Sequence, residues 1–165
     1  MCNYEVAHCR EEGSNPVPVT DRIQREIVVA APVERLWEVL TRPEHIGRWF
    51  EGMTAQVDLR PGGAMVMVNQ ELGKFHAVIE QVEPPHRLTY RWARHPDTPV
   101  TEGSSTLVEF TLTPEGKGTR VRVVESGFTR TDAVKVDQQR HAEANSQGWR
   151  QVLDSLQRFV EQPTA

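Results

Sequence analysis

The feature that most constrains this chain is a long stretch in which apolar and polar residues alternate with a period of two. It begins at Thr54 and continues for about 75 residues. Turn-forming residues interrupt it, including Pro61-Gly62-Gly63 and Pro84-Pro85. Strands joined by such short turns pair antiparallel. Together with one strand that precedes this stretch, the expected strands span residues 22–29, 55–59, 64–70, 74–82, 86–94, 105–113 and 119–128.

Two short segments with helical spacing lie between the first strand and the alternating stretch. The apolar residues of 33–40 recur at i, i+3, i+4 and i+7, behind a proline that suits the first turn of a helix. A second short helix is expected from Pro43 to about Gly47. It would carry Trp49 and Phe50 to the rim of whatever the sheet encloses.

The last element is a proline-free segment, residues 131–161, with an apolar stripe at helical spacing in its C-terminal half and a polar N-terminal half. The resulting order of elements is α+β. A twisted antiparallel sheet curls, and one helix cannot fill its concave side at both ends. We therefore expect a curved antiparallel sheet of six to seven strands around a long C-terminal helix, with a cavity beside the polar half of that helix.

Composition and charge exclude several classes of function. The chain has 19 Lys and Arg against 23 Asp and Glu, a formal net charge of -4, and no basic run of the kind that nucleic-acid binding needs. No apolar run approaches the roughly 20 residues of a membrane span, and the N-terminus lacks the pattern of a signal peptide. We therefore expect a cytoplasmic protein with no membrane span and no nucleic-acid partner.

Residues 1–20 are predicted to be a disordered or loosely docked leader, ahead of a single domain over residues 21–162. Within the leader, Cys2, His8 and Cys9 match no common zinc module, so we expect no metal site there. The chain also lacks HExxH, GxGxxG and Walker motifs. We therefore expect no cofactor.

Seven aromatic residues are candidates for the wall of a ligand-binding cavity. Two interpretations remain open, because aromatic side chains bury large areas and usually serve ordinary core packing. For Trp37 and Phe159 we favour the core, since both lie far from the expected cavity mouth. The seven candidates are Trp49, Phe50, Phe75, Tyr90, Trp92, Phe110 and Trp149.

His141 and Asn145 are the candidate polar residues, because they lie one helical turn apart on the face that meets the sheet. A histidine there could hydrogen-bond a ligand or act as a general base. Glu125 should point inward from its strand, where a carboxylate needs a partner. If it meets His141, the two form an acid/base pair, and both are then catalytic candidates. If it pairs with an arginine such as Arg91 or Arg122, its role is structural.

Four segments, in their order and spacing, resemble a known family. They are RIQREIVVAAPVERLWEVLTRPEHIGRWF, PGG, EPPHRLTYRW and GWRQVLDSL. Together they resemble the START-like SRPBCC superfamily, and within it the branch similar to the C-terminal domain of the activator of heat-shock protein 90 ATPase. The resemblance covers residues 21–162 approximately. It implies a helix-grip fold, in which a curved sheet grips the terminal helix around a ligand-binding cavity.

The resemblance leaves three functions open, because one fold hosts many activities. Members of the superfamily bind lipids, polyketides, hormones or aromatic compounds, some are cyclases or dehydratases, and others bind a chaperone. Our first interpretation is binding of a small hydrophobic molecule, aromatic or lipid-like. The alternatives are a cyclase- or hydrolase-type enzyme that uses His141 and Glu125, and a module that activates a chaperone ATPase. A homodimer is a further hypothesis on partners.

Overall fold

The computed structural model describes residues 20–50 and 52–163, so most of the predicted leader, including Cys2, His8 and Cys9, lies outside the described residues. Seven strands and three α-helices make up the described domain. The helices are α2 (Val33–Thr41), α3 (Pro43–Trp49) and α4 (Lys135–Glu161). The strands are β1 (Arg22–Val29), β2 (Met53–Val57), β3 (Ala64–Asn69), β4 (Gly73–Glu83), β5 (Arg87–Ala93), β6 (Ser105–Glu115) and β7 (Gly118–Ser126).

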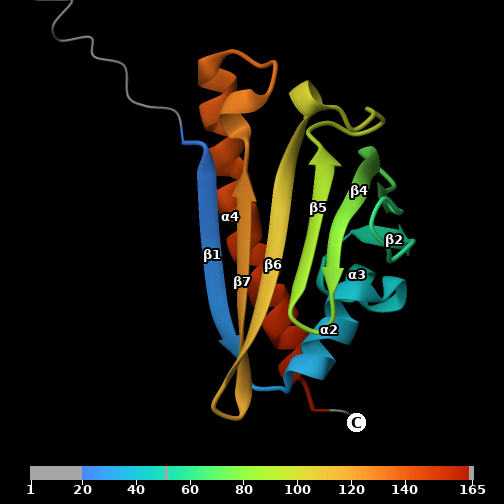
Figure 1. Ribbon diagram of the computed structural model, residues 1–165, viewed down its shortest axis with the longest axis vertical. Coiled ribbons are helices and arrows are strands. Elements are labelled where there is room, and N and C mark those ends of the chain that lie inside the picture. The colour runs from blue at the N-terminus through green and yellow to red at the C-terminus, as the bar shows by residue number, and fades with distance from the viewer. Residues whose placement is uncertain (1–19, 51, 164–165) are drawn as a thin grey trace, which may run out of the picture.

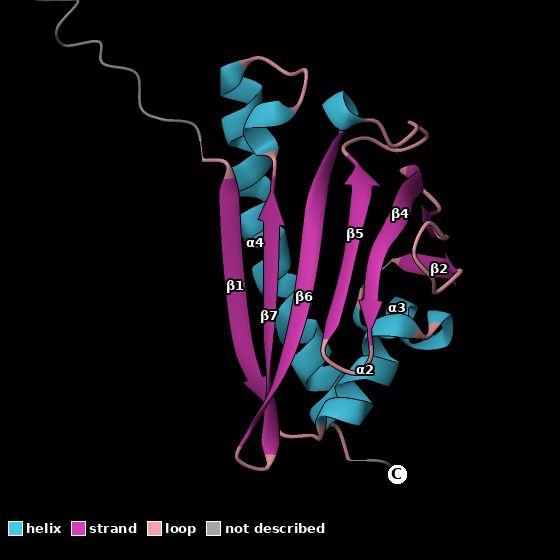
Figure 2. Cartoon of the chain, in the orientation of Figure 1, coloured by secondary structure: helices cyan, strands magenta, loops and turns pink. Residues whose placement is uncertain are grey.

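The strands form one antiparallel sheet in the order β1-β7-β6-β5-β4-β3-β2. Figure 1 shows α4 running behind β1, β7 and β6. Figure 2 shows α2 and α3 at one end of the strands, where α2 contacts β6 and β7 and α3 packs on β2 at the edge of the sheet. The predicted α+β class, with a curved seven-stranded sheet around a long C-terminal helix, is confirmed. The helix-grip fold implied by the resemblance is confirmed with it.

The two halves of α4 meet the sheet differently. In the C-terminal half, the fully buried side chains of Leu153 and Leu156 belong to the apolar core. In the N-terminal half, a buried amide takes their place, and Gln138 Nε2 donates to the carbonyl oxygen of Thr131 at 3.0 Å. The predicted change from apolar to polar along this helix therefore corresponds to a change in how it contacts the rest of the protein.

The helix begins at residue 135, four residues later than predicted. The strand before it ends at Ser126 because Gly127 turns the chain with a φ of 94°, a left-handed conformation that favours glycine. A short 3₁₀ turn, Phe128–Arg130, follows. It is held by the carboxylate of Asp21, which accepts a hydrogen bond from the backbone N–H of Thr129 at 3.1 Å. These local contacts compete with helix formation, so the segment before residue 135 stays irregular.

Gly47 lies inside α3 and does not end it as predicted. A Cβ atom at this position would lie 2.6 Å from the carbonyl oxygen of Met53 in β2, far closer than real Cβ atoms approach. The missing side chain therefore lets α3 pack directly on β2. This contact fixes where the chain emerges from α3, at Phe50.

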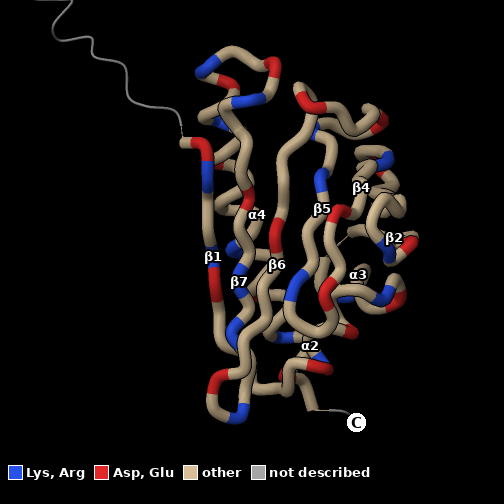
Figure 3. Tube along the Cα trace, in the orientation of Figure 1, with Lys and Arg blue, Asp and Glu red and all other residues tan. Residues whose placement is uncertain are grey.

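Positively and negatively charged residues are interspersed along the strands (Figure 3). Glu26 of β1 accepts hydrogen bonds from Arg120 at 2.7 Å and from Arg122 at 3.1 Å. Arg87 and Glu109 pair in the same way at 3.0 Å. These arginines are therefore paired with carboxylates. None of the helices in the described part has the length and apolarity that crossing a bilayer needs.

Candidate functional site

Glu125 lies completely buried between the sheet and α4. Its carboxylate accepts hydrogen bonds from two indole groups, Trp149 Nε1 at 2.8 Å and Trp92 Nε1 at 2.9 Å. Thr106 Oγ1 donates at 2.5 Å, and Asn145 Nδ2 lies 3.0 Å from both carboxylate oxygens. Acceptance of four hydrogen bonds is the pattern of an ionised carboxylate, which has acceptors only. The inward direction inferred from strand parity is therefore correct.

The arginines considered as partners of Glu125 pair elsewhere. Arg91 points away from the helix side of β5 and lies 3.4 Å from Glu80. Arg122 lies 3.1 Å from Glu26 on the outer face. The charge of Glu125 is therefore stabilised by neutral donors instead of a cation. Such donors can do this because a hydrogen bond to a charged group is stronger than one between two neutral groups.

Asn145 lies between the two residues considered as an acid/base pair. Its Nδ2 donates to Glu125 and also lies 3.2 Å from His141 Nε2. Direct proton transfer needs the two groups within hydrogen-bond reach of each other or of one water. With the amide between them, the arrangement supports a positioning network better than an acid/base pair.

The imidazole of His141 is packed against the ring of Phe128, at 4.9 Å between centroids and an interplanar angle of 81°. Because Asn145 donates to Nε2, the ring proton lies on Nδ1, which is buried without a hydrogen-bond partner among the residues that the structure describes. Burial lowers the pKa of His141 to about 4, and the positive charges of Arg94 and His95 add to this effect. The imidazole is therefore neutral at neutral pH.

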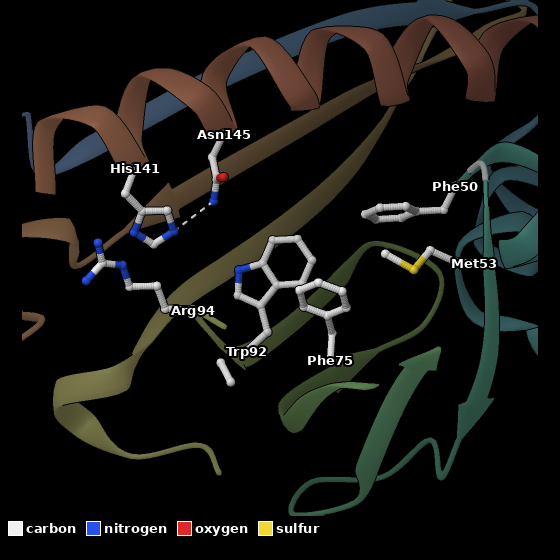
Figure 4. Close-up of a pocket in the computed structure, with 8 residues that line it drawn as sticks. Phe50, Met53, Phe75, Trp92, Arg94, His141 and Asn145 are labelled. Atoms are coloured by element: carbon white, nitrogen blue, oxygen red, sulfur yellow. Dashed lines mark hydrogen bonds between the residues drawn. The ribbon is translucent and has the colours of Figure 1, made fainter. Parts of the chain in front are cut away.

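A hollow of roughly 140 Å³ lies beside this network, between α4 and the sheet (Figure 4). Phe50, Met53, Phe75 and Trp92 form its apolar walls. At its other end Figure 4 shows three polar side chains, Arg94, His141 and Asn145. An apolar hollow with a few polar groups at one end is the usual form of a small-molecule site.

A second hollow, of roughly 170 Å³, adjoins the first. Phe50, Trp92 and Asn145 line both hollows. Trp149 and Val152 line the second hollow but not the first. These shared side chains therefore form the partition between two adjacent spaces, each about as large as a cavity that holds one benzene ring.

Five of the nine predicted ligand-binding residues line the first hollow, namely Phe50, Phe75, Trp92, His141 and Asn145. Trp149 stacks on Trp92, with ring centroids 5.5 Å apart, and lines the second hollow.

The other three predicted residues are buried in the aromatic core. Trp49 donates from Nε1 to the carbonyl oxygen of Val39 at 2.8 Å. Tyr90 and Phe110 pack on each other at 6.4 Å between ring centroids. Burial, with the negative charge of Glu125, raises the pKa of the Tyr90 phenol well above its usual value. Tyr90 and Phe110 therefore have the positions of core side chains, whereas Trp49, which is also buried, borders a separate hollow together with Phe50 and Val152.

Arg94 was not predicted as a site residue, although the sequence holds a signal for it. Alternate residues of β5 face the helix side, including Tyr90 and Trp92, and residue 94 continues the same parity. Its backbone N–H donates to the carbonyl oxygen of Ser104 at 2.7 Å, which holds the chain in line after the strand ends. Met53 was missed because its strand begins two residues earlier than predicted.

Comparison with solved structures supports this fold assignment. The protein MLL2253 from Mesorhizobium loti is 25% identical with a TM-score of 0.72, over 87% of this chain and 99% of its own. CalU16 from Micromonospora echinospora is 28% identical with a TM-score of 0.61, over 85% and 76%. NE0264 from Nitrosomonas europaea is 25% identical with a TM-score of 0.66, over 89% and 98%.

Among curated proteins, no sequence matches this chain. A family model does match, over residues 30–161, and its description is Activator of Hsp90 ATPase homolog 1-like protein. The match spans α2 to α4 and includes every residue of the hollow and of the Glu125 network. The resemblance inferred from the four sequence segments is confirmed, and the chain belongs to the family of Activator of Hsp90 ATPase homolog 1-like proteins within the START-like SRPBCC superfamily.

Proposed function

We propose that the protein binds a small, mostly apolar molecule about the size of one aromatic ring, in the hollow between α4 and the sheet. The observation that carries this proposal is the hollow itself, with its walls of Phe50, Phe75 and Trp92. Its volume of roughly 140 Å³ is close to that of an apolar cavity that takes up benzene. Aromatic walls also favour an aromatic guest through edge-to-face and stacked contacts.

The size of the hollow favours an aromatic ligand over a long lipid chain. Drug-sized ligands occupy sites of about 300–1,000 Å³, well above this volume. A longer molecule would need to displace the Phe50 side chain and enter the adjoining hollow of roughly 170 Å³. The sequence left two ligand classes open, aromatic and lipid-like. Of these, the volume of the hollow favours an aromatic compound with a single ring.

A binding role agrees with the chemistry of the polar end. His141 is neutral, and the carboxylate of Glu125 is enclosed by its four donors. Groups that are held in this way can orient a ligand, whereas a general base needs a free lone pair that faces the substrate.

The test is ligand-observed ¹⁹F NMR with 4-fluorophenylacetamide, a neutral one-ring probe. We expect saturable line broadening of the probe. Met53→Trp, which fills the hollow, should weaken binding at least tenfold. The matched control is Val78→Trp, which adds the same side chain at an exposed position of β4. Equal weakening by both substitutions, or no saturable binding of any one-ring probe, would show that this hollow is not a binding site.

Native mass spectrometry of the purified protein gives independent evidence on the ligand. A co-purifying molecule with the mass of a one-ring compound is the expected result. The Met53→Trp variant should lose this mass shift, whereas the Val78→Trp variant should keep it.

A further inference from the structure

The polar end of the hollow carries an arginine that forms no ion pair with any described residue. Arg94 lines the hollow, and Figure 4 shows its guanidinium beside the His141 ring, on the side opposite Asn145. Other arginines of the sheet lie in ion pairs within the described part of the chain, for example Arg87 with Glu109 and Arg91 with Glu80. The ion pairs among the described residues do not include Arg94.

The other ionisable groups around Arg94 form no ion pair with it in the described part of the chain. Glu125 is completely buried, and its oxygens accept hydrogen bonds from Trp92, Trp149, Asn145 and Thr106. His141 is neutral and His95 is basic, so neither supplies negative charge. The polar end of the hollow therefore holds a guanidinium without an ion-pair partner among the described residues.

A second donor lies next to this guanidinium. His141 Nε2 accepts from Asn145, so Nδ1 carries the ring proton, and it is a buried atom without a hydrogen-bond partner in the described residues. Figure 4 shows this nitrogen on the Arg94 side of the ring. Of these two donors, Nδ1 has almost no exposed surface, so Arg94 is the one that a ligand in the hollow reaches directly. A ligand that presents acceptor oxygens at this end of the hollow would meet the guanidinium of Arg94.

We infer that the ligand of this hollow is an aromatic carboxylic acid, with its ring between Phe50, Phe75 and Trp92 and its carboxylate at Arg94. This inference rests on the proposed function, because it concerns the same hollow. A guanidinium presents its N–H groups in a fork that matches the two oxygens of a carboxylate, which makes arginine suited to this class of ligand. Arg94 is half-buried, so solvent screening limits the preference for the acid over a neutral isostere to about fivefold to tenfold.

The experiment compares two probes that differ in charge at nearly constant shape. The acid is 4-fluorophenylacetate and its neutral isostere is 4-fluorophenylacetamide, both titrated by ¹⁹F NMR at low and at moderate salt. The wild-type protein should bind the acid about fivefold to tenfold more tightly than the amide at low salt. Added salt should reduce this preference and leave the amide affinity unchanged, because screening acts on the charged ligand.

The variants assign the preference to one side chain. Arg94→Gln should reduce the acid affinity to that of the amide, and Arg94→Lys, which keeps the charge, should retain most of the preference. The matched control is Arg91→Gln, three residues earlier on the outer side of the same sheet, where the arginine pairs with Glu80. It should leave both affinities unchanged. Circular dichroism confirms that each variant is folded.

The outcomes separate this inference from the proposed function. Equal affinity of the wild-type protein for both probes, or a preference that survives Arg94→Gln, overturns the inference and leaves the binding site intact. If neither probe binds, the proposed function fails and this inference fails with it. A tighter acid whose advantage disappears in Arg94→Gln, and not in Arg91→Gln, supports both.

Discussion

Two buried tryptophans offer a direct measurement of what the enclosed carboxylate contributes to stability. Trp149 and Trp49 are equally buried, and each donates one hydrogen bond of 2.8 Å from its indole nitrogen. They differ in the acceptor, because Trp149 donates to the carboxylate of Glu125 and Trp49 donates to the backbone carbonyl of Val39. Substitution of each tryptophan by phenylalanine removes the donor and a similar part of the ring.

The magnitude follows from the kind of hydrogen bond that is lost. A bond to a charged group contributes about 1.5–3 kcal/mol and a neutral one about 0.5–1.5 kcal/mol. The packing loss is common to both substitutions, so we expect Trp149→Phe to lower the free energy of unfolding by roughly 1–1.5 kcal/mol more than Trp49→Phe. For a domain of this size, that difference corresponds to a Tm lower by about 2–6 °C.

The assay is equilibrium urea unfolding followed by far-ultraviolet circular dichroism, because both substitutions remove a fluorophore. The two variants should have similar slopes and different midpoints, which shows that the difference lies in stability and not in the area exposed on unfolding. Equal costs, or a larger cost for Trp49→Phe, would refute the reasoning, since Glu125 would then not act as a charged acceptor in the folded protein.

Three further predictions concern the helices and the hollow. The folded-state pKa of His141, about 4, lies below its reference value of 6.5, so its contribution to stability is complete above about pH 6.5 and is lost as the pH falls toward 4. After a discount for partial exposure the loss is about 1–2 kcal/mol. Urea unfolding at several pH values measures this loss of stability on acidification. The loss should vanish in His141→Gln and persist in His76→Gln. Gly47→Ala should destabilise the protein by about 1–3 kcal/mol, because its Cβ would lie 2.6 Å from a β2 carbonyl oxygen. Gly148→Ala in α4 should stabilise it by up to about 1 kcal/mol, because no atom outside the backbone of its own helix lies within 4 Å of the added Cβ. Thermal unfolding with the opposite order of the two variants would contradict this. Phe50→Ala should join the two hollows and let the protein bind the two-ring probe N-phenyl-1-naphthylamine. Binding is measured as enhanced fluorescence of the probe. If the variant and the wild type bind the probe with equal affinity, Phe50 is not the partition between the hollows.

The fold was predictable because periodicity and strand parity are local properties of a sequence. Alternation with a period of two placed Glu125 on the inner face, and helical spacing placed His141 and Asn145 on the face of α4 that meets the sheet. Element boundaries were less accurate where glycines act. Gly127 ends β7 early, and Gly47 serves a close contact inside α3 instead of ending it.

The partners within the site were not predictable, because parity gives the direction of a side chain and not what it reaches. The sequence offered His141 or an arginine as the partner of Glu125, whereas two indole groups and an amide hold it. These donors come from β5 and α4, which are far apart in the chain and meet only through tertiary packing. The size of the hollow depends in the same way on how aromatic rings such as Phe50 pack, which spacing alone does not determine.

The donors around Glu125 belong to β5, β6 and α4, so one carboxylate joins both layers of the molecule. Apolar contacts tolerate small sliding movements, whereas hydrogen bonds weaken steeply once their angles change. A shift of α4 by one residue would turn Asn145 and Trp149 away by about 100° and break their bonds to Glu125 together. The carboxylate therefore fixes both the rotation of α4 and its distance from the strands. The hollow beside it persists because the polar half of α4 cannot move closer to the sheet.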